Sequence, residues 1–145
     1  MRLIHAPLST ACLEQTDAVV LLQLDRLRLA KRRWRGTADD GMEFGFDLEL
    51  PFRDGTLFYR DGGAVYRIQQ MPEPVIEIAC PADPLGAARV GWLLGNLHFP
   101  LELQGGRLRV ADDPAVRQMA GREGLEHFFC DAVFQPVAGG HTHGF

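Results

Sequence analysis

The sequence predicts an α+β fold in which an all-β N-terminal part precedes a part that mixes strands and helices. Turn signals with glycine recur between short apolar runs through residues 17–68, and helical and strand periodicities alternate from residue 72 onwards. The chain has 145 residues, of which 46% are hydrophobic, and this is enough for one medium core or two small ones. We therefore expect a folded protein with two domains.

Tight turns separate the strands expected in the N-terminal part. A glycine that can adopt the positive φ of a hairpin turn follows an aspartate at three places, which are Asp40-Gly41, Asp54-Gly55 and Asp61-Gly62-Gly63. Between two of these turns the segment EFGFDLEL alternates, which predicts one apolar face made of Phe44, Phe46, Leu48 and Leu50. We expect residues 1–71 to form an all-β domain.

A change of periodicity marks the boundary between the two parts. Two prolines flank Glu73 in the segment QQMPEPV, which is typical of a linker, and we place the boundary near Met71. The strand VIEIA follows, and then Asp83-Pro84 predicts the start of a helix. The helix should end at Gly95-Asn96, and its apolar stripe is formed by Leu85, Ala88 and Trp92.

A hairpin, a second helix and a last strand complete the second part. The segments HFPLEL and RLRV flank a turn at Gln104-Gly105-Gly106, and Asp113-Pro114 opens a helix whose short apolar stripe contains Val116, Met119 and Ala120. The strand HFFCDAVF should place on one side Phe128, Cys130, Ala132 and Phe134. This order, β-α-β-β-α-β, predicts a ferredoxin-like domain over residues 72–136 and a flexible tail over residues 137–145.

Composition excludes several classes of protein. The most apolar run, AVVLLQL, is much shorter than the roughly 20 residues of a membrane span, and the start of the chain has no apolar targeting segment, so we expect a cytoplasmic protein without a membrane partner. The net charge of −4 argues against nucleic acid, and the basic run KRRWR around Trp34 better suits a solvated face or a protein-docking patch. Cys12, Cys80 and Cys130 show no paired spacing and should be reduced thiols.

The sequence has no nucleotide-binding, serine-hydrolase or metalloprotease motif, and we therefore expect no enzyme. The candidate functional residues are its five histidines. His5 and His127 suit hydrogen-bonded surface positions. His98 follows an apolar helix, where a structural role and a ligand role both remain open. In the tail segment GHTHG, His141 and His143 are two residues apart, so an extended chain can present both imidazoles to one ion.

Three segments together resemble the UreE family of urease accessory proteins. RRWRGTADDGMEFGFDL is similar to the signature of the family's first domain, PADPLGAARVGWLLGNLHFPLEL is similar to the second-domain signature with its G-N-x-H-x-P motif, and VFQPVAGGHTHGF is similar to the segment that ends in a histidine-rich tail. The similarity extends over nearly the whole chain in the family's order. Leu97 stands where the family commonly has arginine, and the tail carries only two histidines.

The resemblance implies a metallochaperone that delivers nickel, Ni(II), for assembly of the urease active site. It implies a homodimer with a peptide-binding-like first domain, in which His98 from each subunit binds metal and His141 and His143 are auxiliary ligands. The implied partners are the urease accessory GTPase and, through it, the apo-urease complex. Imidazole also suits zinc and copper, which could substitute for nickel. The alternative is a peptide- or protein-binding adaptor whose histidines are incidental.

Overall fold

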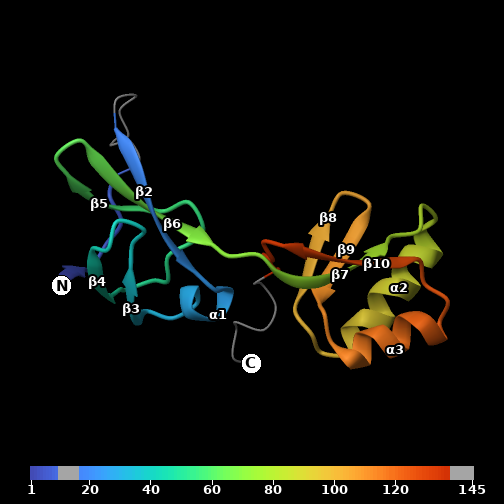
Figure 1. Ribbon diagram of the computed structural model, residues 1–145. Helices are drawn as coiled ribbons and strands as arrows, with labels where there is room; N and C mark the ends of the chain where they lie inside the picture. The colour runs from blue at the N-terminus through green and yellow to red at the C-terminus, as the bar shows by residue number, and fades with distance from the viewer. Residues whose placement is uncertain (10–16, 138–145) are drawn as a thin grey trace. The chain divides into compact units, whose positions relative to one another are not determined.

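The computed structural model describes residues 1–9 and 17–137 and has the mixture of strands and short helices that confirms the α+β class (Figure 1). The chain divides into two compact units, Met1–Met71, here called unit 1, and Pro72–Phe145, here called unit 2. Each unit has a separate cluster of buried apolar side chains. The fold of each unit can therefore be described by itself.

Unit 1 consists of strands with one short helix. Its elements are β1 (Arg2–Ile4), β2 (Ala18–Leu24), α1 (Arg26–Leu29), β3 (Arg33–Thr37), β4 (Glu43–Asp47), β5 (Leu57–Asp61) and β6 (Ala64–Gln70). In the described part of unit 1 they form two three-stranded sheets, with the orders β1-β4-β3 and β2-β6-β5. Each sheet combines one parallel pair, β1 with β4 or β2 with β6, and one antiparallel hairpin.

Two of the three expected hairpin turns are confirmed. Gly41 and Gly62, with φ values of 90° and 60°, join β3 to β4 and β5 to β6. The prediction of a hairpin at Asp54-Gly55 was wrong, because β4 and β5 belong to different sheets. This turn is instead fixed to β6, since the Asp54 carboxylate accepts the backbone N–H of Gln70 at 2.8 Å.

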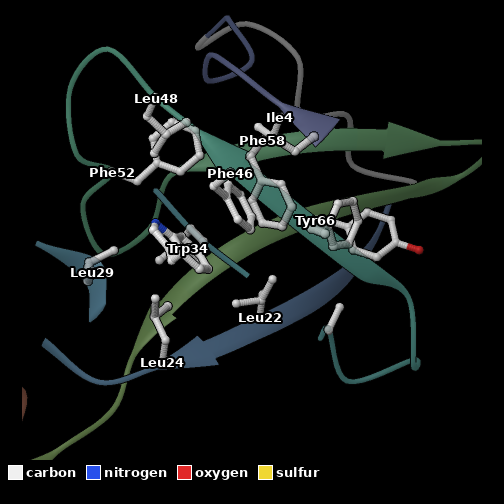
Figure 2. Close-up of a cluster of buried hydrophobic side chains, with 13 residues drawn as sticks. Ile4, Leu22, Leu24, Leu29, Trp34, Phe46, Leu48, Phe52, Phe58 and Tyr66 are labelled. Atoms are coloured by element: carbon white, nitrogen blue, oxygen red, sulfur yellow. The ribbon is translucent and has the colours of Figure 1, made fainter. Parts of the chain in front are cut away.

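Aromatic rings fill the core of unit 1. Figure 2 shows Trp34, Phe46, Phe58 and Tyr66 gathered between strands of the two sheets. The ring of Trp34 stacks on that of Phe46 with centroids 3.8 Å apart, and because only 9% of Trp34 is exposed it is not free to stack on a nucleic-acid base. The apolar face of β4 ends at Leu48. Leu50 was wrongly predicted to belong to it and is 76% exposed, since the chain leaves the sheet before Pro51.

Unit 2 has the predicted order of strands and helices. Its elements are β7 (Glu73–Ala79), α2 (Pro84–Asn96), β8 (Leu101–Gln104), β9 (Arg107–Ala111), α3 (Pro114–Arg122) and β10 (His127–Ala132). The strands form one sheet of order β10-β7-β9-β8, in which all neighbours are antiparallel. Strands β10 and β8 therefore lie at opposite edges. Glu73 and Pro74, which the sequence assigned to a linker, are the first residues of β7.

Both helices of unit 2 begin where aspartate and proline predicted. The carboxylates of Asp83 and Asp113 accept backbone N–H groups of the first turn, and proline follows each of them. The buried stripe of α3 is Val116, Met119 and Ala120, as expected. In α2 the stripe of Leu85, Ala88 and Trp92 is the exposed face of the helix, whereas Val90 and Leu94 on another face are buried. Helix α2 is apolar on two faces, so periodicity could not identify the inner one.

The last strand is shorter than expected. Strand β10 ends at Ala132, and Phe134, predicted to continue its face, is fully buried two residues beyond it. Phe128 and Phe129 on this edge strand are 42% and 49% exposed. In the described residues Cys80 and Cys130 are free thiols, as expected, whereas Cys12 lies outside them.

Candidate metal centre

His98 lies directly after α2, at the point where the chain turns towards β8. The backbone N–H of Leu97 donates to the carbonyl of Leu94, and that of His98 donates to the carbonyl of Gly95, each at 3.1 Å. These bonds between residues three apart tighten the last turn and end the helix. The helix therefore delivers His98 to the surface, where the residue is exposed.

The backbone of His98 is strained. Its φ is 60°, in the left-handed region, and it is the one residue other than glycine with a positive φ among residues 1–9 and 17–137. Glycine is the usual residue at such a helix end, because a Cβ atom in this conformation costs roughly 1 kcal/mol. Histidine at this position is therefore less favourable for the fold than glycine. Strain of this kind is concentrated at functional sites.

The imidazole of His98 is free to bind a ligand. Among the described residues its side chain has no hydrogen-bond partner, and no group of three or more histidine, cysteine, aspartate or glutamate side chains able to hold a metal ion occurs there. One imidazole does not complete a metal site. If His98 binds a metal, the other ligands must come from a second copy of the chain or from residues beyond the described part.

Two of the expected ligands, His141 and His143, lie outside the described residues. The described chain ends near His98, however. The backbone N–H of Val137 donates to the carbonyl of Leu101 at 2.8 Å, and Leu101 is three residues after His98. His141 follows Val137 by four residues. The position of Val137 beside Leu101 could not be predicted from the sequence, because this contact joins residues 36 positions apart.

An apolar surface lies on the same helix as the candidate ligand. Leu85 and Trp92 of α2 are 85% and 66% exposed. They lie seven residues apart, on the same face of the helix. Trp92 is therefore accessible, whereas its neighbour Leu93 and the nearby Phe99 are half-buried and pack against the core of unit 2.

The two other described histidines contact backbone carbonyl oxygens. Nδ1 of His5 is 3.1 Å from the carbonyl oxygen of Asp47, and Nδ1 of His127 is 2.7 Å from that of Leu125. These partners agree with the expectation of ordinary hydrogen-bonded histidines. They leave His98 as the described histidine whose side chain is uncommitted.

Comparison with known proteins connects this geometry to a family. The family model described as "UreE urease accessory protein, C-terminal domain" matches residues 73–144, which include His98 and both tail histidines. A urease accessory protein UreE of Beijerinckia indica subsp. indica is 34% identical over 131 residues, covering 89% of this chain and 74% of that protein. The chain belongs to the UreE family of urease accessory proteins.

Further UreE relatives agree with this assignment. The UreE proteins of Burkholderia orbicola and Burkholderia thailandensis are 38% and 34% identical over 120 and 148 residues. These matches cover 79% and 97% of this chain, but 58% and 67% of the two relatives, so the chain spans less than two thirds of the Burkholderia orbicola protein. Membership of a family of accessory proteins confirms that the chain is not an enzyme. Within the described residues, no helix has the length and apolar character to cross a membrane.

Proposed function

We propose that this UreE protein binds Ni(II) as a cargo and delivers it for assembly of the urease active site. The observation that carries the proposal is His98, an exposed and uncommitted imidazole held in a left-handed conformation at the end of α2. This residue belongs to the segment that matches the family's C-terminal domain. A strained histidine where glycine would be more stable is best explained if the imidazole itself is needed.

The proposed site requires two copies of the chain. One His98 from each subunit forms the primary ligand pair, and His141 and His143 add ligands from the tail. Leu85 and Trp92 support a homodimer through unit 2, because large apolar side chains exposed together on one helix commonly mark an interface. A twofold axis beside α2 would bring two His98 side chains to the same ion.

Imidazole ligands suit capture and release of nickel. They also bind zinc and copper, and the usual order of affinity places copper above nickel, so ligand type does not select nickel. We infer that selectivity comes from the supply of metal and from the partner that receives it. An open site with few ligands releases its ion more readily than a closed cage of four protein ligands. A carrier needs this property.

Unit 1 is proposed to dock the partner, the urease accessory GTPase that acts on the apo-urease complex in the cytoplasm. Arg33 and Arg35 are exposed on β3, and Arg32 directly precedes that strand. Arg33 donates to Asp47 at 2.8 Å, but both side chains face solvent, so this surface pair adds little stability and leaves the arginines accessible. A basic surface of this kind suits an acidic protein partner.

One feature of unit 1 favours the alternative function, a peptide- or protein-binding adaptor. A largely apolar cavity of about 360 Å³ is lined by residues that include Pro7, Leu50, Pro51 and Phe52. Short peptides bind grooves of this character through apolar anchors. If the adaptor function were the main one, His98 would be dispensable for the role of the protein.

Nickel titration calorimetry distinguishes these functions. The wild-type chain should bind nickel tightly, His98→Ala should nearly abolish tight binding, and a chain cut after Gly139 should bind roughly tenfold to a hundredfold more weakly, because tethered imidazoles act at up to about millimolar concentration. Acidification should weaken binding, since a protonated imidazole is not a ligand. Unimpaired nickel binding by His98→Ala would show that His98 has only a structural role.

A further inference from the structure

Strand β10 forms an edge of the unit 2 sheet that lacks the usual protection of edge strands. Its sequence, HFFCDA, contains no proline or lysine, and its register with β7 runs without a bulge. Natural edge strands are commonly blocked by such features, because their unpaired backbone groups otherwise pair with another chain. On β10 two aromatic side chains, Phe128 and Phe129, are instead 42% and 49% exposed. Among the described residues no strand covers this edge, so it is open to a further strand.

The backbone groups that β10 presents at this edge follow from one hydrogen bond at its start. The N–H of Ala79 donates to the carbonyl of Glu126 at 3.0 Å, so these two residues form a hydrogen-bonded pair of the antiparallel ladder. Along such a ladder these pairs alternate with pairs whose backbone groups point away from each other. In the register of β10 with β7, the residues with outward backbone groups are therefore His127, Phe129 and Asp131. Each of them offers an N–H and a carbonyl to a further strand.

The exposed aromatic rings of β10 are held in place by neighbouring side chains. The guanidinium carbon of Arg117 lies 4.2 Å from the centroid of the Phe129 ring, and the carboxylate of Asp112 accepts hydrogen bonds from Arg117 at 2.6 and 2.7 Å. On the other face of the strand, the guanidinium carbon of Arg107 lies 5.4 Å from the centroid of the Phe128 ring. Side chains that are ordered before binding lose less entropy on association. Both faces of the edge therefore suit a protein contact.

One register of self-pairing uses all the outward backbone groups of β10. If two copies of β10 lie antiparallel with a twofold axis at Phe129, the two Phe129 residues face each other and His127 faces the partner subunit's Asp131. The three outward residues of each copy then all have partners. An axis shifted by one residue leaves one of them without a partner in the other β10, and an axis at Asp131 places two carboxylates opposite each other, which is unfavourable.

We propose that β10 is a self-association surface that pairs with β10 of a second copy in the register centred on Phe129. The two Phe129 side chains then meet on one face of the joined sheet, and on the other face Phe128 meets the partner subunit's Cys130. This inference is independent of the proposed nickel site. Strand β8, which follows His98, lies at the opposite edge of the sheet, so pairing at β10 leaves that edge free.

Pairing through one strand edge should be weak. Interfaces that bury less than about 1,200 Å² are typical of transient complexes, and a contact confined to one strand belongs to this class. We therefore expect association at a protein concentration of about 500 µM and little at about 10 µM. Homodimers that form through α2 at micromolar concentration would be joined into larger assemblies at the higher concentration.

Register-specific cross-linking tests the pairing in the full chain. Phe128→Cys places a new thiol opposite the partner subunit's Cys130, in a pair whose Cα atoms should be about 4.5 Å apart, within the range of disulfides. Two thiols at position 128, or two at position 130, are diagonal neighbours at about 7–8 Å and should not be bridged. The control Phe128→Cys/Cys130→Ser therefore lacks the matching thiol. Each protein is oxidised with diamide at about 500 µM, and mass spectrometry of the linked peptides identifies the bond.

Phe128→Cys should form a covalent dimer through positions 128 and 130 in about tenfold higher yield than the control. Absence of this bond in Phe128→Cys would overturn the pairing. A bond between two thiols at position 128 in the control would overturn the proposed register, because it belongs to an axis at Phe128. A bond between two Cys130 residues in the wild type would overturn it in the same way, because it belongs to an axis at Cys130.

Sedimentation equilibrium measures the same association without a cross-link. The weight-average mass of the wild type should rise about twofold between about 10 and 500 µM, whereas Phe129→Asp should show no rise, because two carboxylates would meet at the axis. Leu27→Asp, at a side chain of unit 1 that is 67% exposed, is the matched control and should behave as the wild type. Circular dichroism reports whether Phe129→Asp is folded, and the cross-linking result does not depend on that variant. A wild type whose mass does not rise, or a folded Phe129→Asp whose mass rises equally, would overturn the proposal.

Discussion

His98 combines a functional side chain with an unfavourable backbone conformation. Glycine at this position would remove the strain of a positive φ of 60°, whereas alanine would keep it. We expect His98→Gly to be more stable than His98→Ala by about 1 kcal/mol, and both to lose tight nickel binding. Chemical unfolding measures the difference in stability, and titration calorimetry measures the affinity for nickel.

The comparison of these two variants distinguishes an effect on protein stability from the loss of the imidazole as a metal ligand. Because His98→Gly should be at least as stable as the wild-type chain, failure of that variant to bind nickel cannot be attributed to unfolding. Retention of tight nickel binding by the glycine variant would contradict the proposed site. Equal stabilities of the glycine and alanine variants would instead contradict the strain assigned to the backbone.

At the scale of elements, charged side chains connect three neighbouring strands of unit 2. Glu77 on β7 is 3% exposed and accepts hydrogen bonds from Arg107 and Arg109, both on β9, and Arg109 also reaches Glu102 on β8. The hydrogen bond from Arg109 is the main reason that the pKa of Glu77 lies below its ordinary value of 4.5. The carboxylate therefore stabilises the fold at neutral pH.

We expect Glu77→Gln to destabilise the protein by about 2 kcal/mol at pH 7, because it removes the charged acceptor of the largely buried Arg109 and leaves that arginine paired with Glu102. The folded-state pKa is lowered, so the contribution of Glu77 is fully present above its ordinary pKa of 4.5 and is lost as the pH falls towards the folded-state value. The difference in unfolding free energy between wild type and Glu77→Gln should therefore decrease as the pH falls below 4.5. Urea unfolding at several pH values measures this difference in unfolding free energy. Glu126→Gln, at an exposed glutamate, is the control variant. A difference between wild type and Glu77→Gln that does not change with pH would contradict the assigned cause.

Helix α2 carries a second apolar face that the core of unit 2 does not cover. If this face forms the homodimer, Trp92→Asp should yield a monomer in analytical ultracentrifugation at micromolar concentration that is still folded by circular dichroism, since Trp92 is 66% exposed and lies outside the core of unit 2. The matched control is Leu27→Asp in unit 1, where Leu27 is 67% exposed, and it should remain a dimer. A wild-type chain that is monomeric with and without nickel would rule out the proposed dimer.

At the scale of the whole molecule, each unit has its own core, and we expect the two units to have different functions. The described part of unit 1 supplies no cluster of metal-binding side chains, and the proposed ligands all lie in unit 2 or in the tail. A chain consisting of residues 72–145 should therefore bind nickel with nearly the affinity of the full chain, as measured by calorimetry. A folded and dimeric fragment that does not bind nickel would show that unit 1 contributes to the site.

Features decided within a few residues were predicted from the sequence. Helix starts at Asp83-Pro84 and Asp113-Pro114 follow from capping, and the turns at Gly41 and Gly62 follow from the freedom of glycine to adopt positive φ. These signals act over a single turn of chain and need no tertiary partner. The order of elements in unit 2, and the histidine that follows its first helix, could be identified for the same reason.

Features that depend on distant partners were decided only by the tertiary structure. The sequence of α2 offers two apolar faces, and the inner one is set by what packs against Val90 and Leu94. Glu77 is buried in an apolar strand because Arg109 lies opposite it on β9, and Glu102 is buried because Arg109 and the returning chain at Gln135 both bind it. The cost of burying a carboxylate is offset only when strand register brings a donor to it, and register is a property of the assembled sheet.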